Sequence, residues 1–151
     1  MESEPVAHVL VVAHKTAATP ALLDSVRERA QRGPCYFHLV VPSPGPRGGE
    51  DGRQVLALAL PLLEEAAHRP VTGSVSPRHD PMDAVEEALH EGDFDEIIVS
   101  TLPRGVSRWL HIDLPRRVAH LGLPTTTVIA KGATPIRTRF RPSRARSRRA
   151  G

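Results

Sequence analysis

The feature that most constrains the fold is a regular alternation of two kinds of segment along the 151 residues. Short runs enriched in valine, isoleucine and leucine alternate with longer segments whose apolar residues recur every three or four positions. The short runs are typical of strands buried on both faces, and the longer segments are typical of amphipathic helices. We therefore expect strands over residues 7–13, 36–41, 71–76, 96–101 and 125–130.

Cap and turn residues place four helices between these strands. Thr19 and Asp80 are each followed by proline, which predicts an N-cap residue with proline at the first helical position. Asp113 is expected to cap the last helix in the same way. Residues 42–52 contain three prolines and four glycines and predict a loop, so the second helix is expected only from Val55. The resulting β-α-β-α-β-α-β-α-β order predicts one mostly parallel sheet covered by helices on both faces.

The charged residues divide the chain into two regions. Residues 1–134 hold 13 Lys and Arg against 17 Asp and Glu, a net charge of −4, and are expected to form one α/β domain. Residues 135–151 have no acidic residue and too few apolar ones to fold alone, so we expect a disordered Arg-rich tail. Such a tail is either a solvated end or a site that captures RNA or another polyanion electrostatically. Its candidate nucleic-acid-binding residues are Arg137, Arg139, Arg141, Arg144, Arg146, Arg148 and Arg149.

Several classes of protein are excluded by composition and by missing motifs. The single cysteine, Cys35, excludes an internal disulfide and a cysteine-based zinc site. No apolar run approaches the roughly 18 residues of a membrane span, and the start MESEPVAHV is too acidic for a signal peptide. A soluble, cytoplasmic protein is therefore expected. The glycine-rich loops of dinucleotide-binding and P-loop proteins are absent from the sequence, as is the nucleophile elbow of hydrolases.

Candidate binding residues lie in the loops that follow the expected strands, where parallel sheets bind their ligands. His14, His79 and His111 each follow a strand, but three separate loops without ligand spacing predict no metal site and no catalytic residue. Arginines gather between the fourth strand and the last helix, which favours an anion such as phosphate. The candidate anion-binding residues are His14, Ser100, Thr101, Arg104, Gly105, Arg108 and Asp113.

The whole order of strands and helices resembles the universal stress protein family, and residues 95–130 resemble its C-terminal signature most closely. The matching residues are DEIIV at 95–99, Arg117-Val118, and LPTTTVI at 123–129, and the resemblance spans roughly residues 6–131. Together with the alternating pattern, it implies a five-stranded parallel sheet in the order 3-2-1-4-5 with two helices on each face. It also implies a non-catalytic regulatory or binding protein that forms a homodimer through its last strand, residues 125–130.

The sequence departs from the family at the positions that approach a nucleotide. When Arg117-Val118 is aligned, the three glycines of the family loop fall at Val99, Leu102 and Ile112, and its Ser or Thr falls at Asp113. Larger side chains keep backbone N–H groups away from phosphates, and an aspartate adds repulsion. His14 or Lys15 also stands where many family members carry an acidic residue that contacts the base. We therefore expect weak or no ATP binding, and no cofactor.

Two other functions remain compatible with the sequence. The protein could be a nucleic-acid- or ribosome-associated stress factor that is recruited through its Arg-rich tail. It could instead be a small enzyme acting on a nucleotide or phosphorylated metabolite, with His14 or His111 as acid or base.

Overall fold

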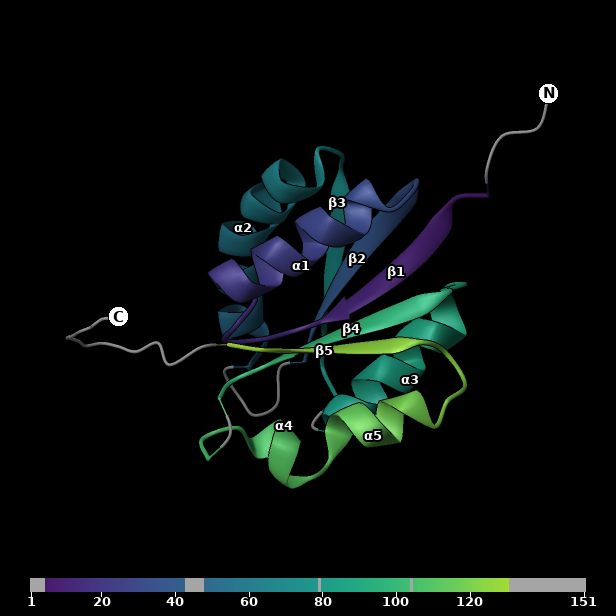
Figure 1. The fold of residues 1–151 in the computed structure, drawn as a ribbon. Helices are drawn as coiled ribbons and strands as arrows, with labels where there is room; N and C mark the ends of the chain where they lie inside the picture. The colour runs from purple at the N-terminus through teal and green to yellow at the C-terminus, as the bar shows by residue number, and fades with distance from the viewer. Residues whose placement is uncertain (1–4, 43–47, 79, 104, 131–151) are drawn as a thin grey trace, which may run out of the picture.

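Five parallel strands form one sheet in the order β3-β2-β1-β4-β5 in the computed structural model (Figure 1), which confirms the predicted sheet. The structure describes residues 5–42, 48–78, 80–103 and 105–130. Each strand comes close to its predicted range, and β1 lies at the centre, between β2 and β4. The strands are β1 (Ala7–Val12), β2 (Cys35–Pro42), β3 (Val71–Ser76), β4 (Glu96–Thr101) and β5 (Thr125–Ile129).

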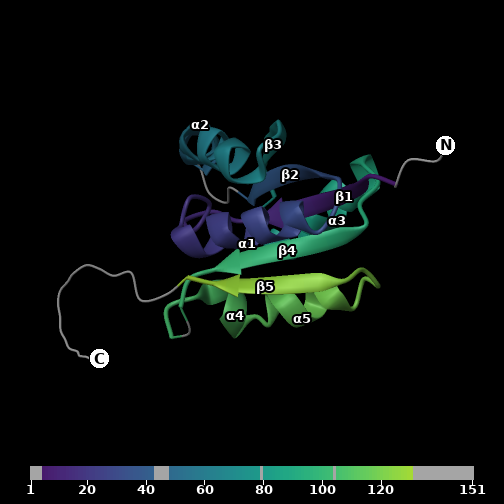
Figure 2. The same ribbon diagram turned by 45° about the horizontal axis from the view of Figure 1, so that its top comes forward.

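Helices lie on both faces of this sheet (Figures 1 and 2). Helices α1 (Pro20–Gln31) and α2 (Gly48–Ala67) pack on one face, and α3 (Pro81–Glu91), α4 (Arg108–His111) and α5 (Leu114–Ala119) lie on the other. Successive side chains of β1 point to opposite faces, so Val9 belongs to the first core and Leu10 to the second. Both side chains are fully buried, as the valine-rich runs predicted.

The predicted N-caps of helices α1 and α3 are confirmed. The Thr19 hydroxyl accepts a hydrogen bond from the Leu22 N–H at 3.4 Å, and Asp80 accepts one from the Met82 N–H at 2.8 Å. Asp113 differs, because it precedes α5 in a left-handed conformation (φ 57°, ψ 39°) and its side chain makes no cap hydrogen bond. Asp113 is thus the N-cap residue of α5, as predicted, but a capping side chain typically belongs to an extended residue, so the predicted cap hydrogen bond does not form.

Two helices depart from the predicted pattern. Helix α2 begins at Gly48, inside the expected loop; its first N–H groups need no intrahelical partner, and Asp51 near its start is favoured by the helix dipole. An additional short helix, α4, forms because the Ser107 hydroxyl accepts a hydrogen bond from the Leu110 N–H at 3.1 Å. The described part of the chain therefore has five helices, where two on each face were expected.

Helices lie on both faces, as predicted, but they leave one end of the sheet uncovered. On the α3 face, the β2–β3 end of the sheet is left open, and Tyr36, Thr72 and Ser74 are exposed there. This end of the sheet alternates polar and apolar residues because only one of its faces is buried. None of the helices within the described ranges is long and apolar enough to cross a membrane.

Candidate functional site

A pocket of about 250 Å³ opens at the carboxyl ends of β1 and β4. The chain leaves β1 toward β2 on one side of the sheet, and β4 lies on the other side, so the strand order reverses here. Parallel α/β sheets bind their ligands at this kind of position. The residues that line the pocket are His14, Lys15, Pro42, Asp51, Pro81, Ser100, Thr101, Leu102, Val106, Ser107, Arg108 and Trp109.

Two neighbouring hydroxyl groups at the end of β4 behave differently. The Ser100 hydroxyl lies 2.6 Å from the hydroxyl of Thr16, and both side chains are buried. The next side chain, Thr101, is 2% exposed, and its hydroxyl has no hydrogen-bond partner among the described residues. A buried hydroxyl without a partner costs about 1–3 kcal/mol. The Thr101 hydroxyl therefore has unused hydrogen-bonding capacity in a residue that lines the pocket.

Positive charge dominates the rim of the pocket. Lys15 and Arg108 are exposed lining residues, and Asp51 is the acidic residue among the described lining residues. Burial lowers the pKa of His14, and the nearby Lys15 lowers that pKa further, while Asp51 acts in the opposite direction. His14 is therefore neutral near pH 7 and offers a hydrogen bond without charge. Two cations beside one carboxylate suit an anionic ligand.

The loop after β4 has only part of the shape expected for a phosphate loop. Gly105 has a φ of +93°, a conformation that favours glycine. Leu102 lines the pocket with a full side chain, whereas Val99 is fully buried inside β4 and is not a loop residue. Ile112 and Asp113 lie beyond α4 and do not line the pocket. Four positions depart from the family pattern, and among them only Leu102 places its side chain in the wall of this pocket.

The structure brings together four of the predicted site residues, namely His14, Ser100, Thr101 and Arg108. Gly105 belongs to the adjoining loop but does not line the pocket, and Asp113 lies 3.9 Å from Arg116 on α5. The other predicted or considered residues, Arg104, His79 and the seven tail arginines, lie outside the described residues.

Several lining residues were not predicted from the sequence. Lys15 follows His14 directly, and its position after β1 was a usable signal. Asp51 was assigned to a loop and enters the pocket because α2 starts early, which the periodicity did not indicate. Trp109 and Ser107 come with α4, a helix too short to leave an apolar period.

His111, the second histidine considered for acid–base chemistry, is exposed at the end of α4 and is not a lining residue. His14 and His111 therefore do not share this pocket. In the described ranges, there is also no group of three or more His, Cys, Asp and Glu residues that could hold a metal ion.

The element order and this switch-point pocket define the chain as a doubly wound α/β protein, and comparison with solved structures identifies the particular fold. A universal stress protein from Archaeoglobus fulgidus superposes with a TM-score of 0.60 at 15% identity, covering 81% of this chain and 93% of that one. The universal stress protein from Archaeoglobus fulgidus in complex with dAMP gives a TM-score of 0.54 at 16% identity, covering 84% and 98%. A universal stress protein in complex with cAMP gives 0.57 at 15% identity, again covering 84% and 98%.

The chain thus has the universal stress protein fold, which confirms the predicted resemblance at the level of structure. No family model matches the sequence, and no curated protein matches it.

Proposed function

We propose that this chain is a non-catalytic regulatory binding protein whose switch-point pocket takes a small phosphorylated ligand of the nucleoside monophosphate class. The observation that carries the proposal is the buried Thr101 hydroxyl, which has no partner among the described residues and lines a pocket rimmed by Lys15 and Arg108. A phosphate oxygen can accept a hydrogen bond from this hydroxyl while the two cations balance its charge.

The size and lining of the pocket favour a monophosphate over ATP. At about 250 Å³, the pocket is smaller than the roughly 300–1,000 Å³ of sites that enclose drug-sized ligands. Leu102 stands in the wall where a glycine would give a triphosphate access to backbone N–H groups. Two of the similar solved structures are complexes with dAMP and cAMP, each of which carries one phosphate. We therefore expect ATP to bind weakly or not at all.

The proposed role is non-catalytic because the two histidines considered for acid–base chemistry do not meet in the pocket. His14 is partly buried with a lowered pKa, and His111 is exposed outside the lining. A general acid and a general base must both reach the reacting group, so this arrangement favours binding over turnover.

The protein is proposed to act as a homodimer that pairs through β5. This strand lies at the edge of the sheet (Figure 2). Ile97 donates its N–H to the Pro124 carbonyl, and Ala130 donates its N–H to the Thr101 carbonyl, both at 2.9 Å. Even-numbered residues of β5 therefore bond to β4, and the backbone groups of Thr127 face the open edge, where a second copy can pair.

The site assignment is tested by calorimetric titration of the full chain with AMP. Replacing Arg108→Gln removes a rim cation and should weaken AMP binding about tenfold, since a charge-assisted hydrogen bond is lost. The matched control is Arg116→Gln, which removes an exposed arginine of α5 outside the pocket and should leave the affinity unchanged. Equal losses in the two variants would show that AMP binds by general charge attraction, and absence of AMP binding would refute the proposal.

A further inference from the structure

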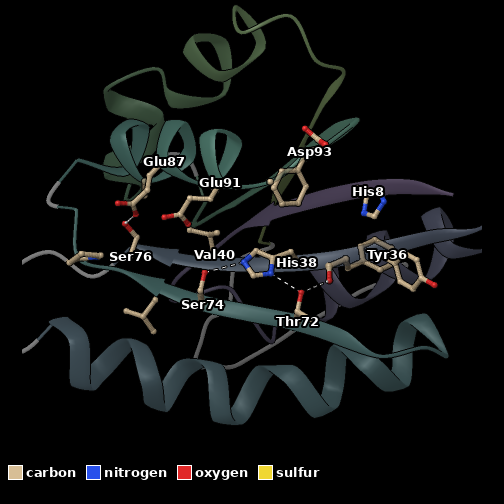
Figure 3. A pocket seen from close by; sticks show the side chains of 17 residues that line it. His8, Tyr36, His38, Val40, Thr72, Ser74, Ser76, Glu87, Glu91 and Asp93 are labelled. Carbon is tan, nitrogen blue, oxygen red and sulfur yellow. Dashed lines mark hydrogen bonds between the residues drawn. The ribbon is translucent and has the colours of Figure 1, made fainter.

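A second and larger hollow lies on the uncovered end of the sheet, and its lining differs in chemical character from that of the switch-point pocket. This groove, of about 720 Å³, has β2 and β3 as its floor and α3 with the following turn as its wall (Figure 3). It extends along the strands from Ser76 and Pro77 at their carboxyl ends to Tyr36 and Asp93 at the other end. None of its lining residues belongs to the switch-point pocket.

The floor of the groove is a polar network centred on His38. Its Nδ1 lies 2.7 Å from the Thr72 hydroxyl and its Nε2 lies 3.0 Å from the Ser74 hydroxyl, as Figure 3 shows. Burial lowers the pKa of His38, and the carboxylate of Glu91 only partly opposes this. The ring is therefore neutral near pH 7 and fixed by partners on both sides, so the floor brings no positive charge.

The wall of the groove is acidic. Glu87, Glu91 and Asp93 line it, and Figure 3 shows Glu87 and Glu91 extending from α3 toward the strands. Glu87 is already engaged, because it accepts hydrogen bonds from Arg78 at 3.1 Å and from Ser76 at 3.0 Å. Glu91 and Asp93 are exposed and form no salt bridge with any described residue. The groove thus carries uncompensated negative charge.

Aromatic rings complete the lining at the Asp93 end. Tyr36 is 54% exposed, with its ring centroid 5.7 Å from that of His8, and Phe94 lies 6.1 Å from His38 by the same measure. Arginine is the side chain that combines a salt bridge to carboxylate with stacking on aromatic faces. Acidic groups beside exposed rings therefore favour guanidinium groups over an ammonium ion or a neutral ligand.

We propose that this groove binds the Arg-rich tail of the same chain, residues 135–151. The tail has seven arginines and no acidic residue, which complements the wall. Its first arginine, Arg137, follows the last described residue, Ala130, by seven positions, and seven extended residues span up to about 24 Å. The end of β5 is separated from β2 by three strand spacings, about 15 Å, so the tail can reach the near end of the groove.

The spacing of the tail arginines is also similar to the spacing of the acidic residues on α3. Arg137, Arg139 and Arg141 occupy every second position, so in an extended chain their side chains lie on one side, about 6.6 Å apart. Glu87 and Glu91 are four residues apart on α3, which places them about 6 Å apart on one helix face. An extended tail can therefore place one arginine beside Glu91 while its neighbour lies near Glu87, which Arg78 already pairs.

Disulfide trapping in the full chain tests this proposal. Pro77 lines the groove, is exposed and makes no side-chain hydrogen bond, so Pro77→Cys with Thr138→Cys places one thiol in the groove and one in the tail. The native Cys35 is 1% exposed and should not compete. Under mild oxidation, we expect an intramolecular disulfide to form roughly fivefold faster than in the same pair carrying Glu91→Gln and Asp93→Asn, because two ion pairs are then lost.

The charge-matched control is the same cysteine pair with Glu28→Gln and Glu65→Gln, which removes two exposed acids from the helices of the opposite face. This control should trap as fast as the parent pair. Equal rates in all three proteins would overturn the proposal, because the tail would then meet the groove only by chance. Disulfides formed only between two molecules would overturn it as well, since the occupant would be another chain.

Discussion

Replacing Thr101→Val should raise the stability of the protein while weakening its ligand binding. The Thr101 side chain is 2% exposed, and its hydroxyl has no partner among the described residues. Valine has nearly the same shape, so the substitution removes the unsatisfied hydroxyl without opening a cavity. Leaving such a group buried costs about 1–3 kcal/mol, and we expect valine to recover about 1–2 kcal/mol of that.

The assay is thermal unfolding of the full chain without ligand, followed by calorimetric titration with AMP. For a chain of this length, 1–2 kcal/mol corresponds to a rise in Tm of about 3–7 °C. Loss of a hydrogen bond to a charged phosphate oxygen should weaken AMP binding about tenfold. The two effects have opposite signs, which is expected of a residue kept for binding at a cost in stability.

The neighbouring hydroxyl provides the control. Ser100 lies 2.6 Å from the Thr16 hydroxyl, and Ser100→Ala leaves that buried group without its partner. This substitution should destabilise the protein by about 1–2 kcal/mol, opposite in sign to the effect at Thr101. If Thr101→Val lowers the Tm, the Thr101 hydroxyl is satisfied in the free protein, and the argument for a ligand at this site fails.

Three further predictions concern the dimer, the tail and the buried histidines. Thr127→Pro removes an N–H that faces the open edge of β5 and should yield a folded monomer by light scattering, whereas Thr127→Ala should stay dimeric; a dimeric proline variant would exclude edge pairing. The alternative in which the tail captures RNA predicts that truncation after Thr134 abolishes RNA retention with almost no change in Tm, and that RNA binding by the full chain falls steeply between about 50 and 200 mM salt; equal retention by both proteins would exclude the tail as an RNA site. Burial lowers the pKa of both His14 and His38 below the ordinary value of 6.5, so the unfolded chain binds protons more readily than the folded chain. The free energy of unfolding should therefore decrease as the pH falls below 6.5. A Tm that does not fall between pH 7.5 and 5.5, or falls equally in a His14→Gln, His38→Gln variant, would contradict this assignment.

The sheet was predictable from the sequence because its signals are local and strong. The run around Val9–Val12 has no polar position to place on a solvent face, which marks a central strand. Thr19 and Asp80 with their following prolines fix two helix starts through bonds that span only two or three residues. Such features depend little on the rest of the fold.

The missed features depend on contacts between distant residues. Asp51 reaches the switch-point pocket only because α2 continues through a glycine-rich segment that by composition predicts a loop. Predicting the groove would have required knowing that α3 leaves β3 uncovered. The polar residues Thr72, Ser74 and Ser76 do occupy every second position of that strand. Period-two polarity on an outer strand of a parallel sheet was the available signal for an uncovered face.

The most direct test of the central claim is a calorimetric comparison of AMP and magnesium-bound ATP on the same preparation of the full chain. We predict that AMP binds in the pocket that contains Thr101, and that ATP binds at least about tenfold more weakly because the Leu102 side chain narrows this pocket. Submicromolar binding of ATP would contradict this account, and would show that the loop after β4 accepts a triphosphate despite the residues that replace its glycines.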